Sequence, residues 1–166
     1  DLANAVLLLL SLSEQPETFP WIDPPTPVAI KQSKELLVKL DALNGETLTS
    51  IGKVLAELPI HPRLGRMLVE GFRLGQEEGV SLSVAILSER DPLSQKGTPH
   101  STNSDLLERV AWIETQEKTK HLRSLWQSQE QLLQLIRSPK VKSLLSSIPK
   151  IKGVSEVEAI LRSVLA

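Results

Sequence analysis

Apolar residues recur every three or four positions along most of the 166-residue chain, and this spacing predicts a mainly helical protein. Leu, Ile and Val fill most of these positions, because the chain has only three Trp, two Phe and no Tyr. Prolines and glycines interrupt the pattern and separate one helix from the next. The expected helical segments are 1–12, 27–43, 50–58, 62–74, 80–89, 105–137, 139–148 and 156–165.

The first sixty residues have the outline of a winged helix. Thr26 is the expected N-cap of the second helix, which we expect Asn44-Gly45 to end. Residues 46–48 follow as a short extended segment, and Thr49 is the expected cap of the third helix. The order of helix, proline-rich loop, helix, short strand and helix is typical of a winged-helix module.

We therefore predict a mainly α fold with two domains. A winged-helix domain with a minimal β-element is expected over 1–60, and a helical bundle over 61–166. Within the bundle, residues 105–137 contain neither Gly nor Pro, which indicates one long helix or two helices separated by a kink.

The charge is unevenly distributed, although the formal net charge is only −1. Residues 1–117 contain an excess of seven acidic groups, whereas residues 118–152 contain eight Lys or Arg and a single acid, Glu130. A segregated basic segment attracts phosphate groups. The alternative interpretation is a charged face that contacts only solvent.

Composition excludes several classes of site. The chain has no cysteine, so disulfides and thiolate metal sites are excluded, and a reducing compartment such as the cytoplasm is expected. The apolar run at residues 5–10 is too short to cross a bilayer and lacks the basic residues of a signal peptide, so we expect no membrane partner. The first residue is Asp1 rather than Met, so we expect a piece of a longer protein.

No catalytic, cofactor-binding or metal-binding group emerges from the motifs. Gly52-Lys53 resembles part of a phosphate-binding loop, but that loop requires GxxxxGK followed by Ser or Thr, between a strand and a helix. Here six residues separate Gly45 from Gly52, and Val54 follows Lys53. The three histidines share no metal-ligand spacing, so we expect this region to be non-catalytic.

The segment 105–137 contains the candidate nucleic-acid interface. On a helical wheel, Arg and Lys side chains and Trp112 lie opposite the leucine stripe, an arrangement that suits stacked bases and phosphates. The alternative is that Trp112 packs against a neighbouring domain. The candidate contacts are Arg109, Trp112, Lys118, Lys120, Arg123 and Arg137.

Three stretches, taken in order, resemble one family. FPWIDPP (19–25), AIKQSKELLVKLDALNGETLTSIGKVLAELPIHPRLGRMLVEG (29–71) and AILSERDPL (85–93) resemble bacterial DEAH-box ATP-dependent helicases of the HrpB type. The resemblance implies a winged-helix domain and a helical-bundle ratchet domain that follow the second RecA-like motor domain. SDLLERVAWIE (104–114) adds looser support.

The resemblance also has departures. The chain has no Walker A motif and no DExH box, so ATP and Mg²⁺ are expected only in motor domains of a parent protein. Asp41 stands in LDAL, where the family pattern L-G-A-L has Gly, and we expect a helical Asp to be tolerated there.

The segment LPIHPRLGRML (58–68) resembles the junction between the winged helix and the ratchet bundle. Two prolines in this segment prevent one continuous helix. His61 is expected to be a packed or capping residue. The two arginines are expected to pair with acids of the motor domain in preference to nucleic-acid contacts. The candidate junction residues are Pro59, His61, Pro62, Arg63 and Arg66.

Together these observations predict a non-catalytic accessory region of a cytoplasmic, ATP-dependent DEAH-box helicase. By the resemblance, it couples the motion of the RecA-like motor domains to a channel for single-stranded RNA or DNA. The alternative function is a helical protein–protein interaction module, in which the bundle docks a partner protein.

Overall fold

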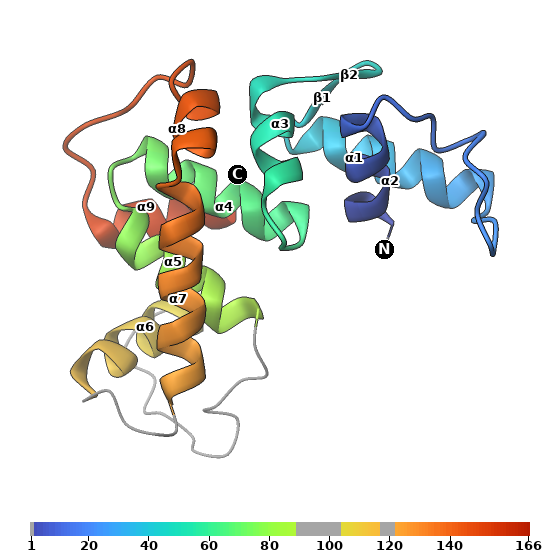
Figure 1. The fold of residues 1–166 in the computed structure, drawn as a ribbon. Coiled ribbons are helices and arrows are strands. Elements are labelled where there is room, and N and C mark those ends of the chain that lie inside the picture. The colour runs from blue at the N-terminus through green and yellow to red at the C-terminus, as the bar shows by residue number, and fades with distance from the viewer. Residues whose placement is uncertain (1, 89–103, 117–121) are drawn as a thin grey trace. The chain divides into compact units, whose positions relative to one another are not determined.

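The computed structural model describes residues 2–88, 104–116 and 122–166, which form two compact units (Figure 1). The first unit comprises described residues of 1–66 together with 139–148, and the second those of 67–138 together with 149–166. These units differ from the predicted domains because residues 139–148 return to the N-terminal unit. The division into domains at 60 and 61 stays a prediction.

The first unit is built from short helices around one hairpin. α1 packs against α2 and α3, and α8 packs against α3. Fully buried leucines from these helices, including Leu7, Leu37, Leu55 and Leu145, form the core. The elements are α1 (Ala3–Ser11), α2 (Pro27–Lys39), β1 (Leu43–Asn44), β2 (Thr47–Leu48), α3 (Ser50–Glu57) and α8 (Pro139–Leu145).

The mainly helical fold with a minimal β-element is confirmed. β1 and β2 form an antiparallel pair in which Leu43 lies opposite Leu48 and Asn44 lies opposite Thr47. Gly45 has a φ of +60°, which the first position of a two-residue hairpin loop requires. Asn44 therefore ends β1 and Gly45 begins the hairpin turn, and the prediction that Asn44-Gly45 ends a helix is wrong.

The α2 helix ends earlier, at Lys39, and Asp41, two residues beyond it, has a φ of +56°. The N–H of Asp41 donates to the carbonyl of Val38 (3.0 Å), and the N–H of Ala42 donates to the carbonyl of Leu37 (2.8 Å). This is the Schellman pattern of a helix C-terminus, whose left-handed position favours Gly. The prediction of a helical Asp41 is wrong, and the left-handed backbone explains why the family pattern has Gly there.

The first turn of α3 packs closely against the same segment. The side chain of Thr49 accepts the N–H of Gly52 (3.0 Å) and donates to the carbonyl of Asp41. A Cβ atom on Gly52 would overlap the carbonyl oxygen of Ala42. Gly52 is therefore a packing glycine inside a helix, as predicted, and not part of a phosphate-binding loop.

The second unit surrounds one buried helix, α5 (Glu77–Ser88). Residues 79–86 of α5 are all buried, and α6, α7 and α9 pack against it. A helix that is buried on every side occupies the centre of its core. α4 (Pro62–Arg73) begins in the first unit and ends in the second, and the other helices are α6 (Asp105–Thr115), α7 (Arg123–Ile136) and α9 (Glu156–Val164).

We predict that Asp41→Gly stabilises the protein by about 0.5 to 1 kcal/mol. Gly removes the cost of a left-handed side chain, part of which is offset by its greater freedom in the unfolded chain. Urea denaturation measures the change. Asp41→Asn is the control, because Asn tolerates the same backbone conformation but removes the charge. A loss of stability in both variants would contradict the prediction and show that the carboxylate of Asp41 matters more than the backbone.

Candidate nucleic-acid interface and helix junction

Two of the predicted contacts, Arg109 and Trp112, lie on α6. Ser104 caps this helix by accepting the N–H of Leu107 (3.4 Å). Arg109 Nη2 lies 2.8 Å from Asp105 Oδ2, one turn earlier, and Trp112 is half-buried. Arg109, whose side chain is 26% exposed, is thus paired with the first turn of its own helix.

Two further predicted contacts, Arg123 and Arg137, lie at the two ends of α7. Arg123 is exposed. Arg137 Nη2 lies 3.0 Å from Glu78 Oε1 and 3.4 Å from Glu77 Oε1, and these hydrogen bonds raise the pKa of Arg137. The two acids lie at the N-terminus of α5 and the arginine lies at the C-terminus of α7, so the helix dipoles stabilise both the negative and the positive charges. Arg137 thus joins α5 to α7.

The predicted contacts do not share one helix face. α6 ends at Thr115, and Gln116 has an extended backbone (ψ 136°), so a single helical wheel over 105–137 is wrong. The alternative of two helices agrees with the structure. Arg123 and Arg137 are roughly 21 Å apart along α7, from a rise of about 1.5 Å per residue. Lys118 and Lys120 lie outside the described residues.

The junction segment breaks the helix as the prolines predict. α3 ends at Glu57, and Leu58 is extended before Pro59. α4 starts at Pro62, whose missing N–H is harmless at a first helical position. Nδ1 of His61 accepts the N–H of Arg63 (3.2 Å), and burial lowers the pKa of His61. His61 is therefore a capping residue. Its Nδ1 accepts a hydrogen bond and so carries no proton.

The two junction arginines differ. Arg63 is exposed, whereas the side chain of Arg66 is only 11% exposed. Arg66 Nη2 lies 3.6 Å from Asp41 Oδ2, at the end of α2. Arg66 therefore links α4 to the helix that precedes the hairpin.

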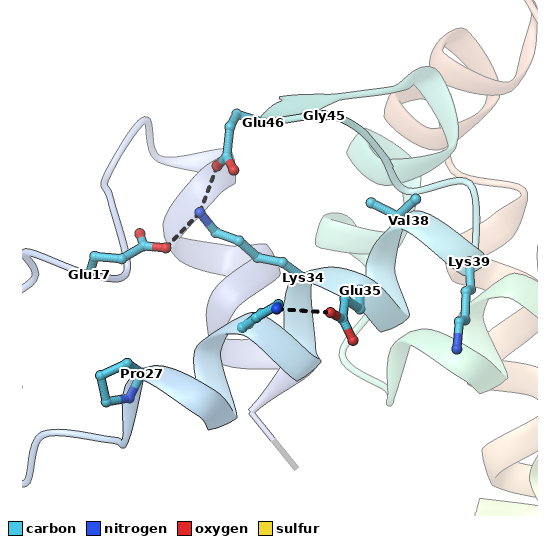
Figure 2. Close-up of a pocket in the computed structure, with 9 residues that line it drawn as sticks. Glu17, Pro27, Lys34, Glu35, Val38, Lys39, Gly45 and Glu46 are labelled. Atoms are coloured by element: carbon cyan, nitrogen blue, oxygen red, sulfur yellow. Dashed lines mark hydrogen bonds and ion pairs between the residues drawn. The ribbon is translucent and has the colours of Figure 1, made fainter.

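The sequence analysis missed one cluster, at Lys34. Its side chain is 15% exposed, and Nζ lies 2.8 Å from Glu17 Oε1 and 2.6 Å from Glu46 Oε2 (Figure 2). The pKa of Glu17 is lowered by its hydrogen bond to Lys34, and the pKa of Lys34 is raised by both carboxylates despite its burial. The cluster ties the proline-rich loop and the hairpin turn to α2. No local spacing indicates it, because its members are far apart in the sequence.

A shallow groove of about 530 Å³ lies beside this cluster, along α2 and the hairpin turn. Val38 and Lys39, toward the C-terminal end of α2 in Figure 2, line this groove together with Glu35, which pairs with Lys31. Most lysines of the groove thus already have carboxylate partners. This charge balance does not favour a phosphate-binding surface on α2.

The described residues contain no cluster of three or more His, Cys, Asp or Glu side chains placed to hold a metal ion. Within them, no helix combines the length and the apolar character that a membrane crossing needs.

One segment of the chain, which includes the hairpin, matches a known protein family. Residues 35–60 match the winged-helix part of the helicase-associated domain family (HA2). Probable ATP-dependent RNA helicase DHX34 of Mus musculus is 37% identical over 92 residues, 54% of this chain and 8% of the relative. The ATP-dependent RNA helicase HrpA homolog of Haemophilus influenzae is 33% identical over 101 residues, 55% of this chain and 8% of the relative.

A solved structure extends the match to nearly the whole chain. The crystal structure of the E. coli DExH-box NTPase HrpB covers 99% of this chain with a TM-score of 0.65 and 26% sequence identity. The chain contains the winged-helix region of the helicase-associated domain of DEAH/DExH helicases, and its whole length is similar to the matched part of HrpB. This helicase-associated region spans only 17% of the HrpB chain and 8% of the two curated relatives. The resemblance inferred from residues 19–93 is confirmed.

We predict that Lys34→Met lowers the free energy of unfolding of the helicase-associated region by about 1 kcal/mol at pH 7. The expected loss is small because the side chains of Glu17 and Glu46 are 50% and 68% exposed, and water weakens their attraction to Lys34. Lys31→Met is the matched control, because the Lys31 side chain is 78% exposed and its Nζ lies 3.9 Å from Glu35 Oε1. Urea denaturation of both variants measures the difference. Equal losses in the two variants would contradict a special role of Lys34.

The same experiment has a pH dependence. The pKa of Glu17 is below its ordinary 4.5 in the folded protein, so its contribution is present above that pH and is lost as the pH falls further. The pKa of Lys34 is above its ordinary 10.5, so its contribution is present below that pH and is lost as the pH rises further. The difference between wild type and Lys34→Met is therefore constant near neutral pH and shrinks in strong acid.

Proposed function

We propose that this helicase-associated region is a non-catalytic part of an ATP-dependent DEAH-box helicase, in which it couples the motion of the motor domains to a channel for a single nucleic-acid strand. The observation that supports the proposal most is the structural match to HrpB over 99% of the chain. ATP and Mg²⁺ would bind the RecA-like motor domains of the parent protein. We also propose a cytoplasmic location, with which a chain without cysteine is compatible.

Within this proposal, the strand contacts the bundle through α6 and the start of α7. Trp112 is half-buried, so part of its ring is accessible to a base. Arg109 and the exposed Arg123 supply cations for phosphates. Lys118 and Lys120 belong to the same proposed surface by sequence.

A second function is favoured by α9. Val157, Leu161 and Val164 are 55%, 45% and 52% exposed and follow one another at helical spacing. An exposed apolar stripe of this kind is typical of a surface that docks another protein. The helical protein–protein interaction module therefore stays the alternative.

We predict that Trp112→Ala in the parent protein weakens binding of single-stranded RNA about tenfold or more, because one stacked base contributes roughly 1 to 3 kcal/mol. RNA-stimulated ATP hydrolysis falls with it, whereas hydrolysis without RNA is unchanged. Trp112→Phe is the matched control, which keeps an aromatic face. Unchanged RNA affinity and unchanged stimulation in Trp112→Ala would refute this contact and favour the protein-docking function.

The coding sequence upstream of residue 1 provides an independent test. The proposed parent requires GxxxxGK followed by Ser or Thr, and a DExH box, in that upstream sequence. Absence of both motifs would remove the helicase function.

A further inference from the structure

Two glutamates from different helices meet inside the second unit, and we call them the carboxyl pair. Glu114 lies in the last turn of α6, and Glu156 is the first residue of α9. A hydrogen bond joins their side chains, and it requires that one of the two carboxyl groups carries a proton. The pair therefore connects α6 to α9, two helices that both pack against α5.

The backbone of α5 holds one member of the pair in place. Gly79 of α5 is buried, and a Cβ atom on it would lie 2.5 Å from Cδ of Glu156. The carboxyl group of Glu156 therefore lies directly on α5, in the space that the missing side chain of Gly79 provides. The start of α9 is fixed as well, because Ser155 Oγ accepts the N–H of Glu158 (3.3 Å). Glu156 thus has little freedom to move away from Glu114.

The two helix ends determine which glutamate holds the proton. The N-terminus of α9 stabilises a negative charge on Glu156, whereas the C-terminus of α6 destabilises one on Glu114. The pKa of Glu114 is raised by its partial burial, by the negative charge of Glu156 and by the hydrogen bond between them. The proton therefore resides on Glu114, which donates it to the carboxylate of Glu156.

The carboxyl pair has no cation of its own within the part of the chain that the structure describes. Neither glutamate forms an ion pair with a Lys or Arg of the described residues, so no direct ion pair offsets repulsion between two carboxylates. The charged groups on the surrounding elements are Glu70 with Arg73, Glu77 and Glu78 with Arg137, Asp105 with Arg109, Glu158 with Arg162, the buried Glu108, and the exposed Arg123, Glu130, Lys150 and Lys152.

We propose that the carboxyl pair is a pH-sensitive latch between α6 and α9. While Glu114 holds its proton, the hydrogen bond to Glu156 joins the two helices. When Glu114 releases the proton to solvent, two carboxylates face each other, and the last turn of α6 separates from α9 because Glu156 is held on Gly79. Ile113 is fully buried and keeps the rest of α6 in the core, so the change is confined to the helix end. The latch goes beyond the proposed function, since it needs neither a nucleic acid nor a partner protein.

The direction of the pH dependence follows from the proton balance. A glutamate with a raised pKa binds more protons in the folded than in the unfolded chain, so stability falls as the pH rises from the ordinary 4.5 through the raised value. Glu114→Gln replaces the carboxyl group with an amide that still donates to Glu156 but does not titrate. We expect this variant of the 166-residue chain to have a higher urea midpoint than wild type at neutral pH, and nearly the same midpoint at about pH 4.

Glu158→Gln is the matched control, because it makes the same change in the first turn of the same helix. Glu158 Oε1 lies 2.6 Å from Arg162 Nη2, so the control is expected to lower the midpoint at neutral pH, which is the opposite sign. Glu156→Gln is expected to reduce the pH dependence as Glu114→Gln does, since it removes the other charge. Subtracting the wild-type midpoint at each pH cancels the titration of all other groups.

Two NMR measurements on the same chain follow the latch directly. The carboxyl carbon signal of Glu114 reports its proton, and amide hydrogen exchange, corrected for its intrinsic dependence on pH, reports opening of the last turn of α6. We expect protection of this turn to increase as the pH falls in wild type and to be independent of pH in Glu114→Gln.

Several outcomes would overturn the latch. A gain for Glu114→Gln that is equal at both pH values would show an effect of packing alone, and a loss at neutral pH would show that the carboxylate is stabilising. Titration of the Glu114 carboxyl carbon at the ordinary value would also overturn it. So would equal protection of the last turn of α6 at both pH values, because repulsion would then release nothing.

Discussion

The winged-helix unit depends on one close approach between backbones, at the carbonyl oxygen of Ala42. This oxygen accepts the N–H of Thr49 (3.1 Å), and the missing side chain of Gly52 allows α3 to pack directly on it. Ala42 is fully buried and also closes the C-terminus of α2 through its own N–H. The end of α2, the hairpin and the start of α3 are therefore fixed together at one point. Any side chain at position 52 would separate them.

The position of most helices follows from local signals in the sequence. Thr26 and Thr49 each accept the N–H expected of an N-cap, and Ser155 accepts the N–H of Glu158. Proline at position 62 starts α4 where its missing N–H has no cost. These features depend on residues three or four apart, so the sequence alone is sufficient to predict them.

Other features were missed or misplaced, some of them because their partners are distant in the sequence. Asn44-Gly45 suits a helix end and a hairpin turn equally well, and only the pairing of β1 with β2 decides between them. The left-handed backbone of Asp41 was not expected, although the Gly that the family pattern has at this position indicates it. The carboxylate partners of Lys34 and Arg137 belong to other elements, so a helical wheel shows both as free cations. A count of basic and acidic residues along the sequence therefore does not show which Lys and Arg side chains lack a carboxylate partner in the fold.

The return of α8 to the first unit has a consequence for how the protein folds during synthesis. α3 and its partner α8 are separated by more than eighty residues, so the N-terminal unit cannot complete its core when its own contiguous segment leaves the ribosome. Domains usually fold in the order in which they are made, and contacts between distant segments slow folding. Here the unit that is synthesised first is completed only after most of the second has emerged, and a nascent chain that stops before Pro139 exposes the apolar face of α3 that α8 covers.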